Sequence, residues 1–241
     1  MPKGLFTKCT GLKKISLPFV GGGFRGTEFM SYLFGANSGT IYSGIPKTLK
    51  EIEIRGGYEL DDYAFYGFSS VTKITLPDTI EEIGVNSFCG CNSLIELTVP
   101  FVGSTVSDNQ YFAYLFGDSV GSRPDTYRDK NYVLPDSLTT LKIRDGMTII
   151  PTNCFYGLKK NLATIELPNT ITEIEDKAFY DADSLTSIII PDSVTTLGKS
   201  VFESCSGSTP AISSLGRKTL FLNHAREGSY ALFAVWIKIE S

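Results

Sequence analysis

The sequence predicts a repeat solenoid, a stack of short coils with a parallel β-sheet along one face. Three observations predict this fold. A short apolar motif recurs along the chain, and its regular copies lie 23 residues apart. A phenylalanine precedes most copies at a nearly constant spacing. A unit of this size cannot bury its own apolar face, so neighbouring units must stack and cover one another.

The first element of each unit is a short β-strand. The motif is Leu-x-x-Ile-x-Leu, and its seven copies start at Leu12, Leu49, Val71, Leu94, Leu138, Leu162 and Leu185. The Ile-x-Leu step has the period of a strand, so these residues should point inward and the residue between them outward. Proline follows five of the copies and ends strand pairing, because it has no N–H to donate. Seven parallel strands spaced about 4.8 Å apart predict a rod at least about 30 Å long.

The second element is a turn that carries a phenylalanine. This residue occurs as Phe6, Phe65, Phe88, Phe155, Phe179 and Phe202. Three residues later stands another side chain that we expect to point inward, namely Cys9, Phe68, Cys91, Leu158, Ala182 or Cys205. A free cysteine packs well as a small apolar residue, so Cys9, Cys91 and Cys205 are predicted to be buried thiols.

Cys89 is the exception among the cysteines, because tyrosine fills its position in other copies, and we expect it to be the most accessible thiol. Cys89 and Cys91 resemble half of a zinc site. No second pair follows them, and tetrahedral zinc needs four ligands. We therefore predict no metal and no cofactor.

Two long inserts interrupt the regular spacing, at residues 18–45 and 100–134. Parts of them match at an offset of 82 residues without a gap. Each contains an apolar stripe that predicts a short helix, formed by Phe29, Met30, Leu33 and Phe34 in one insert and by Tyr111, Phe112, Leu115 and Phe116 in the other. We expect these helices to plug the apolar column, and a functional protrusion is the alternative.

The ends of both predicted helices have suitable residues. Thr27 and Asn109 are favourable N-caps, and Gly35 and Gly117 fit the position just past the helix end.

Gly21, Gly23 and Gly26 of the first insert match the Gly-x-Gly-x-x-Gly pattern of dinucleotide-binding sites. Its duplicate has Gly103, Thr105 and Asp108 at these positions, so we interpret the glycines as turn residues.

We place a domain boundary at residue 205, with the solenoid over residues 1–205 and a linker plus a C-terminal cap over residues 206–241. Ser208 stands where the next leucine belongs, and residues 206–216 are rich in serine and glycine. Residues 218–223 and 231–239 then predict a β-hairpin. Phe233 and Trp236 would cover the last coil, and His224 would lie in the turn as an ordinary solvated side chain.

The repeated stretches 80–94 and 174–185 resemble the BspA-like leucine-rich repeat family, and the likeness extends from residue 4 to about residue 205. The resemblance implies a right-handed solenoid with a parallel sheet on one face. It also implies a bacterial or protist protein that is secreted or lies on the cell surface and adheres to host or matrix proteins or to other cells. The family supplies no catalytic motif. The chain starts in mid-repeat without a signal peptide or N-terminal cap, so we expect a fragment of a longer protein.

Composition excludes several other functions. The net charge of -4 argues against nucleic-acid binding, which needs a basic face. Because the sequence contains a single histidine, most metal sites and catalytic triads that depend on histidine are excluded. The longest apolar run, residues 230–237, is too short to cross a bilayer. We therefore predict a non-catalytic, monomeric interaction module whose partner is a protein or glycan surface.

The predicted binding surface is the outward row of the sheet. It comprises Glu51, Glu53, Lys73, Thr75, Glu96, Thr98, Thr140, Lys142, Thr164 and Glu166. A tyrosine row of Tyr66, Tyr156 and Tyr180 is a second candidate surface. Two alternatives stay open. One is a structural spacer within a larger surface protein. The other is a hydrolase with a site in the insert loops, for which the acid pairs Asp61 with Asp62 and Asp181 with Asp183 are candidates.

Overall fold

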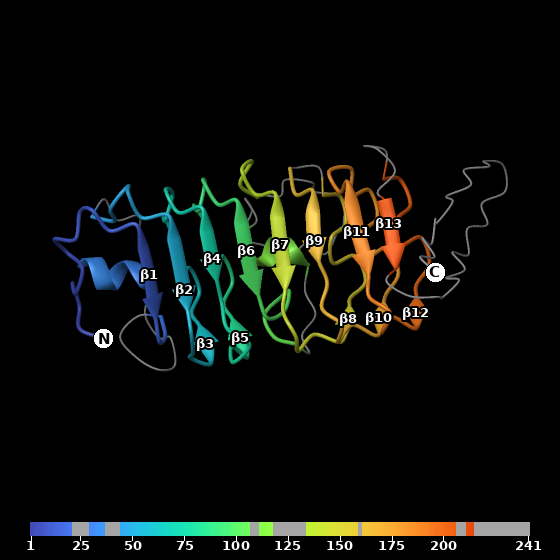
Figure 1. The fold of residues 1–241 in the computed structure, drawn as a ribbon, viewed down its shortest axis with the longest axis horizontal. Coiled ribbons are helices and arrows are strands. Elements are labelled where there is room, and N and C mark those ends of the chain that lie inside the picture. Colours follow the sequence, from blue (N-terminus) through green and yellow to red (C-terminus); the bar gives the residue numbers. More distant parts are fainter. Residues whose placement is uncertain are drawn as a thin grey trace, which may run out of the picture.

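The computed structural model describes residues 1–20, 29–36, 44–106, 111–117, 134–158 and 161–205, and the backbone of residues 211–214. These parts form one elongated stack of coils whose strands lie side by side along its long axis (Figure 1). No helix in these ranges is long and apolar enough to cross a membrane.

A parallel sheet of eight strands runs the length of one face. In spatial order its strands are β1 (Lys14–Leu17), β2 (Glu51–Ile54), β4 (Lys73–Thr75), β6 (Glu96–Val99), β7 (Thr140–Ile143), β9 (Thr164–Glu166), β11 (Ser187–Ile190) and β13 (Ala211–Ser214). The first seven are the strands that the motif predicts. Their Ile and Leu positions are buried, except that Leu167 is only partly buried, which confirms the inward direction expected for this step.

Strand β13 differs from the linker that we expected over residues 206–216. Its backbone pairs in parallel with β11, with Ala211 opposite Ser187 and Ile212 opposite Ile188. Parallel pairing uses backbone N–H and C=O groups, so a coil without the leucine of the motif still extends the ladder. The predicted hairpin at residues 218–239, with His224, Phe233 and Trp236, lies outside the described residues, as does the glycine pattern at residues 21–26.

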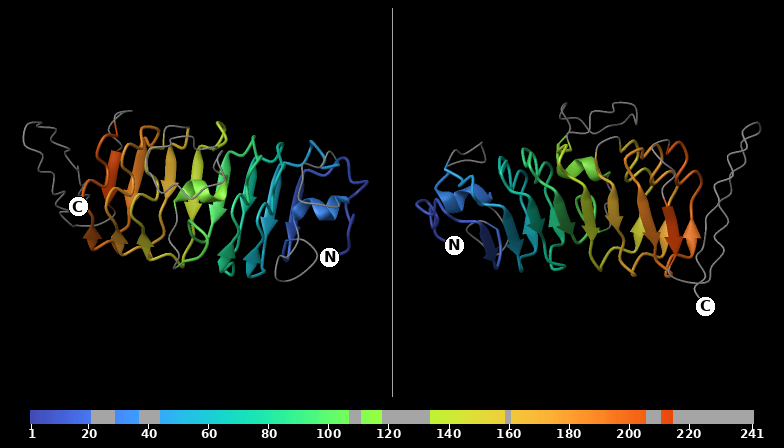
Figure 2. Two further views of the ribbon diagram at one scale, coloured as in Figure 1. Left: turned by 180° about the vertical axis from the view of Figure 1, so that it is seen from behind. Right: turned by 45° about the horizontal axis from the view of Figure 1, so that its top comes forward.

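Shorter strands form a second edge of the coils (Figure 2). Strands β3 (Glu59–Leu60) and β5 (Glu82–Ile83) pair in parallel, and so do β8 (Ile149–Ile150), β10 (Glu173–Ile174) and β12 (Thr196–Leu197). The second insert separates the two sets. At the start of this insert, Thr105 forms an isolated antiparallel bridge with Glu82 of β5.

Hydroxyl groups tie each coil to the one before it. Thr72 Oγ1 donates a hydrogen bond to the carbonyl of Lys50 at 3.1 Å, and Ser137 Oγ donates to the carbonyl of Leu94 at 2.8 Å. The same arrangement recurs where Thr170 Oγ1 donates to Met147 at 2.7 Å. These bonds reach backbone acceptors at the corners, just before the next strand begins.

A column of phenylalanine rings fills the core. Consecutive rings in the column are those of Phe6, Phe34, Phe68, Phe65, Phe88, Phe116, Phe112, Phe155, Phe179 and Phe202. Neighbouring centroids lie between 5.1 and 6.3 Å apart, within the range of favourable aromatic pairs. All but the first ring are buried, so the column seals the coils to one another.

The two insert helices take the place of the phenylalanine turn. Helix η1 (Met30–Phe34) and helix η2 (Phe112–Leu115) are short 3-10 helices. In a regular coil, the Phe65 N–H donates to the carbonyl of Ser87 in the next coil at 2.8 Å. At the insert, the Phe88 N–H donates instead to the Leu115 carbonyl of η2 at 2.9 Å.

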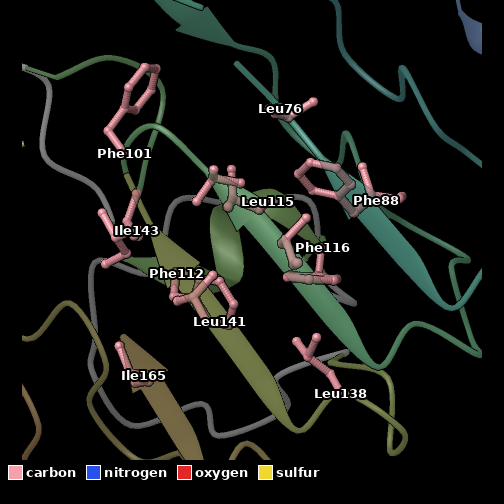
Figure 3. Close-up of a cluster of buried hydrophobic side chains, with 14 of the residues drawn as sticks. Leu76, Phe88, Phe101, Phe112, Leu115, Phe116, Leu138, Leu141, Ile143 and Ile165 are labelled. Atoms are coloured by element: carbon pink, nitrogen blue, oxygen red, sulfur yellow. The ribbon is translucent and has the colours of Figure 1, made fainter. Parts of the chain in front are cut away.

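Side chains at η2 belong to the buried apolar cluster beside the long sheet, as Figure 3 shows for Phe112, Leu115 and Phe116. These three residues are at most 1% exposed. The expectation that the insert helices plug the apolar column is therefore confirmed for the described parts of the inserts.

The helix ends only partly match the prediction. Gly35 and Gly117 have φ angles of 105° and 95°, as expected for the position past a helix end. The predicted N-caps Thr27 and Asn109 are wrong, because the helices begin later, after extended residues Phe29 and Tyr111, and have no side-chain cap. The helices begin where the apolar stripe packs into the core, and no capping side chain sets their first residue.

The cysteine predictions also need one correction. Cys91 and Cys205 are buried as predicted, but Cys9 is exposed and Cys89 is only partly buried. Cys9, and not Cys89, is therefore the most accessible thiol. The reason is position: Cys9 belongs to the first coil, and no described coil covers it from outside.

Candidate interaction surface

The outward residues of the long sheet form two straight rows. The first row contains Lys14, Glu51, Lys73, Glu96, Thr140, Thr164 and Ser187 in register. The second row contains Ser16, Glu53, Thr75, Thr98, Lys142 and Glu166, and Ile189 occupies the same position in β11. The structure thus brings together all ten predicted residues on one face.

One of the ten is not exposed. Thr98 is only 7% accessible, so its prediction as a surface residue is wrong. It lies in register beside Lys142, whose ammonium group reaches diagonally to Glu96, two residues before Thr98. The other nine residues are partly or fully exposed.

Most charged residues of the surface form ion pairs with one another. Lys14 Nζ lies 3.2 Å from Glu51, and Lys73 Nζ lies 3.0 Å from Glu96. These contacts join adjacent strands, because lysine and glutamate alternate along the first row. Exposed pairs of this kind contribute little to stability, on the order of 0–1 kcal/mol, but they fix the direction of the long side chains.

Lys142 bridges two carboxylates. Its Nζ lies 3.2 Å from Glu166 Oε1 and 3.7 Å from Glu96 Oε1. The hydrogen bond from Lys142 to Glu166 raises the pKa of the lysine, and the nearby negative charges of Glu166 and Glu96 act in the same direction. A lysine on this face can therefore hold an acidic partner on each side.

Toward β11 the surface changes character. The first row continues with the uncharged hydroxyl residues Thr140, Thr164 and Ser187. Ile189 of the second row is 50% exposed. The end near β11 is therefore neutral and partly apolar, whereas the first row near β1 carries alternating, paired charges.

Sequence reasoning missed a guanidinium clamp at the edge of this face. Arg144 follows β7 and donates two hydrogen bonds to Asp78, which follows β4, one of them from Nη2 at 3.1 Å. These hydrogen bonds raise the pKa of Arg144. The clamp crosses the coil of β6, from which the second insert departs. One signal was present in the sequence, since Arg144 occupies the position that proline holds after most other strands.

The tyrosine row is divided. Tyr156 and Tyr180 stack in parallel with centroids 5.1 Å apart, and Lys177 Nζ lies 5.8 Å from the centre of the Tyr180 ring. Tyr66 instead meets Tyr63 edge to face, at 5.6 Å. Tyr66 is separated from the stacked pair by the coils of Cys89 and η2, so these tyrosines do not form one continuous surface.

The acid pairs that a hydrolase would use have structural contacts. Asp62 Oδ1 accepts a hydrogen bond from the Val85 N–H of the next coil at 2.8 Å, and Asp176 Oδ1 accepts one from the Lys199 N–H at 2.7 Å in the same way. Asp181 has a left-handed backbone with a φ of 56° and donates its N–H to the Glu203 carbonyl. Among the described residues, no group of three or more His, Cys, Asp or Glu side chains could hold a metal ion.

Several solved structures are similar to this chain. A leucine-rich cell surface protein from Faecalibacterium prausnitzii is 20% identical, with a TM-score of 0.38, and the match covers 84% of this chain and 42% of that one. A leucine-rich repeat protein of T. pallidum is 20% identical, with a TM-score of 0.30, over 68% of this chain and 57% of that one. One from Eubacterium ventriosum is 18% identical, with a TM-score of 0.30, over 73% and 64%. This chain thus spans less than two thirds of each.

No curated protein matches the chain. A family profile described as the BspA type leucine rich repeat region matches six copies over residues 58–115 and 129–216. These ranges include the strand motif, the phenylalanine turn and strand β13, and they cover more than half of the sequence. The chain therefore belongs to the BspA-type leucine-rich repeat family.

Proposed function

We propose that this chain is a non-catalytic protein-interaction module of a secreted or surface-attached bacterial protein, and that it acts as an adhesin toward host proteins, matrix proteins or other cells. Membership of the repeat family supports a role in interaction. Repeat solenoids offer extended surfaces to partners, because each added coil lengthens the same face.

The observation that carries this proposal is the pair of in-register rows on the long sheet. They present an ordered, solvent-facing surface across successive coils. Because the three lysines of this surface are already paired with Glu51, Glu96 and Glu166, a charged partner would have to displace existing contacts at these residues. We therefore place the centre of binding toward the neutral end, around Thr164, Ser187 and Ile189, with Lys142 and Glu166 at its border.

A binding screen followed by paired variants tests this site. The intact chain is applied to immobilised extracellular-matrix proteins and to host-cell glycans. Any partner found is then titrated against Ile189→Asp and Glu166→Lys. The matched controls are Val106→Asp, an equally exposed apolar residue away from the sheet, and Glu82→Lys on β5.

We expect saturable binding that weakens at least tenfold in both sheet variants and stays unchanged in both controls. If the sheet variants bind as well as the wild type does, the site assignment is wrong. If no matrix protein or glycan binds the intact chain, the adhesin role fails.

A structural spacer is the second candidate, and the unbroken phenylalanine column supports it. Rings in contact from Phe6 to Phe202 give the stack a continuous, densely packed core. Such a core resists bending, because each coil is held by the next. A spacer requires flanking domains at both ends, so the sequence of the complete gene product separates this role from adhesion.

A further inference from the structure

We propose that Asp145 is a site of spontaneous covalent modification, at which the side chain condenses with the backbone nitrogen of Gly146 and the residue is converted to isoaspartate. The site lies in the turn that follows strand β7, beside the Arg144–Asp78 clamp and outside the two rows of the long sheet. The modification is independent of the proposed interaction function. Three features of this turn carry the inference.

The reaction needs no enzyme and no reagent other than water. The Gly146 nitrogen attacks Cγ of Asp145, so an N–Cγ bond forms and a C–O bond of the carboxyl group breaks. One water molecule leaves with the proton of the nitrogen. Water then opens the cyclic succinimide at either carbonyl. Opening at the main-chain carbonyl leaves the chain connected through the side chain of residue 145, and this adds a methylene group to the main chain directly after Arg144.

The first feature is the residue that follows the aspartate. Asp145–Gly146 is the one Asp-Gly pair in the sequence, and no Asn-Gly pair occurs. Glycine has no side chain to hinder the attack of its nitrogen, and it gives the backbone the most conformational freedom. In the turns that follow β4, β9 and β11, a threonine or serine occupies the position of Gly146. The corresponding pairs are Asp78–Thr79, Asn169–Thr170 and Asp192–Ser193.

The second feature is a hydrogen bond that this turn has no side chain to make. In the other three turns, the hydroxyl of the second residue of the pair donates to a carbonyl of the preceding coil, from Thr79 to Gly57 at 2.8 Å, from Thr170 to Met147 at 2.7 Å and from Ser193 to Ile171 at 2.6 Å. Gly146 has no hydroxyl to donate. Its backbone is therefore held less firmly to the stack than that of its counterparts, which leaves it free to reach the geometry of ring closure.

The third feature is the open position of the turn. Arg144, Asp145 and Gly146 are three consecutive exposed residues, and a Cβ atom at Gly146 would meet nothing within 4 Å. Gly146 has a φ of 130°, whereas none of the threonine and serine residues at its position has a positive φ. The turn is therefore open to the water that the second step consumes, and no neighbouring group crowds the attacking nitrogen.

The test compares the intact folded chain with a synthetic peptide of residues 143–159, both incubated for several weeks at neutral pH. The protein is then cut after its lysines. This releases residues 143–159, with Asp145 as their one aspartate, and residues 131–142, in which Asp136 stands before Ser137 and is the internal control. Mass spectrometry with electron-transfer fragmentation distinguishes isoaspartate from aspartate. The variants Asp145→Asn and Asp145→Glu are treated in the same way.

We expect isoaspartate at Asp145 of the folded chain to form faster than at Asp136, and at a rate within tenfold of that in the free peptide. Asp145→Asn should react faster still, because a neutral amide is a better electrophile than an ionised carboxylate. Asp145→Glu should stay unmodified, because its larger ring closes much more slowly.

A rate at Asp145 that is no higher than the rate at Asp136 overturns the proposal. A rate more than tenfold below that of the free peptide also overturns it, because the fold would then hold the turn away from ring closure. An asparagine that stays intact at position 145 of the folded chain has the same meaning.

Discussion

The ring of Phe112 in helix η2 lies 5.5 Å from the ring of Phe155, although an insert separates these residues in the sequence. Phe112 also contacts Phe116 at 5.3 Å, and Phe116 continues to Phe88 at 5.8 Å. The insert thus carries the aromatic column from one regular coil to the next. A helix and a turn are interchangeable here because both place buried rings on the stack axis and both continue the backbone ladder.

Removal of the Phe112 ring should interrupt the column of phenylalanine rings. Phe112→Ala is expected to lower the free energy of unfolding by about 3–5 kcal/mol, the usual cost of removing a buried phenylalanine. Equilibrium unfolding in urea measures this loss of stability. Tyr58→Ala is the control, because Tyr58 is 50% exposed, and it should cost far less. Equal costs for the two variants would mean that the ring contacts of η2 do not support the column.

Close approach of coils leaves no room for a side chain at Gly84. A Cβ atom at Gly84 would lie 2.2 Å from the Asp62 nitrogen of the previous coil, whereas one at Gly11 would meet nothing within 4 Å. We expect Gly84→Ala to cost about 1–3 kcal/mol through overpacking, and Gly11→Ala to leave the melting temperature unchanged or slightly raised. Thermal unfolding followed by circular dichroism checks both. A tolerated alanine at position 84 would refute this packing.

Left-handed backbone positions in the turns offer a stabilising change. Asp181 has a φ of 56° at the turn position where Gly67, Gly90 and Gly157 have φ angles of 70° to 78°. Glycine adopts this region without steric cost, so Asp181→Gly should stabilise the fold by about 0.5–1 kcal/mol. Asp183→Gly, where φ is not positive, serves as the control and should not stabilise. Denaturant titration distinguishes them, and a loss of stability in Asp181→Gly would contradict the prediction.

The thiols should differ in reactivity. Cys9 is exposed, and we expect an aromatic disulfide reagent to label it first in the native protein. Burial raises the pKa of the Cys89 thiol, so its labelling should be slower and should need a higher pH. Cys91 and Cys154 should react only after unfolding. Mass spectrometry of the labelled peptides gives the order, and early modification of Cys154 would show that the core opens readily.

The buried thiols also predict a loss of stability at alkaline pH. Burial raises the pKa of Cys154 well above its ordinary value, and it does the same for Cys91, where a charge on Cys89 would add to the effect. In the unfolded chain these thiols ionise near pH 8.5, while the folded chain keeps its protons. Stability should be unaffected below that pH and should fall above it, by about 1.4 kcal/mol per pH unit for each buried thiol.

Urea unfolding between pH 7 and 10 measures this slope. The variant Cys154→Ala lacks one of the thiols, so its stability should fall less steeply than that of the wild type as the pH rises. Identical slopes for the two proteins would show that Cys154 does not contribute.

The sequence by itself determined the solenoid, the seven motif strands and their inward positions, because a short repeat that cannot bury its own apolar face leaves stacking as the one solution. It also determined that residues such as Glu51, Lys73 and Thr164 would share one face, since the period of a strand fixes side-chain direction.

Only the tertiary structure decided how neighbouring coils meet. Thr98 is buried although it lies in the outward row, and Cys9 is exposed although it shares its position with buried residues of other coils. The Arg144–Asp78 clamp joins residues 66 positions apart, and β13 forms through backbone pairing without the leucine motif. These features arise from contacts between coils, and a pattern read along one coil carries no information about them.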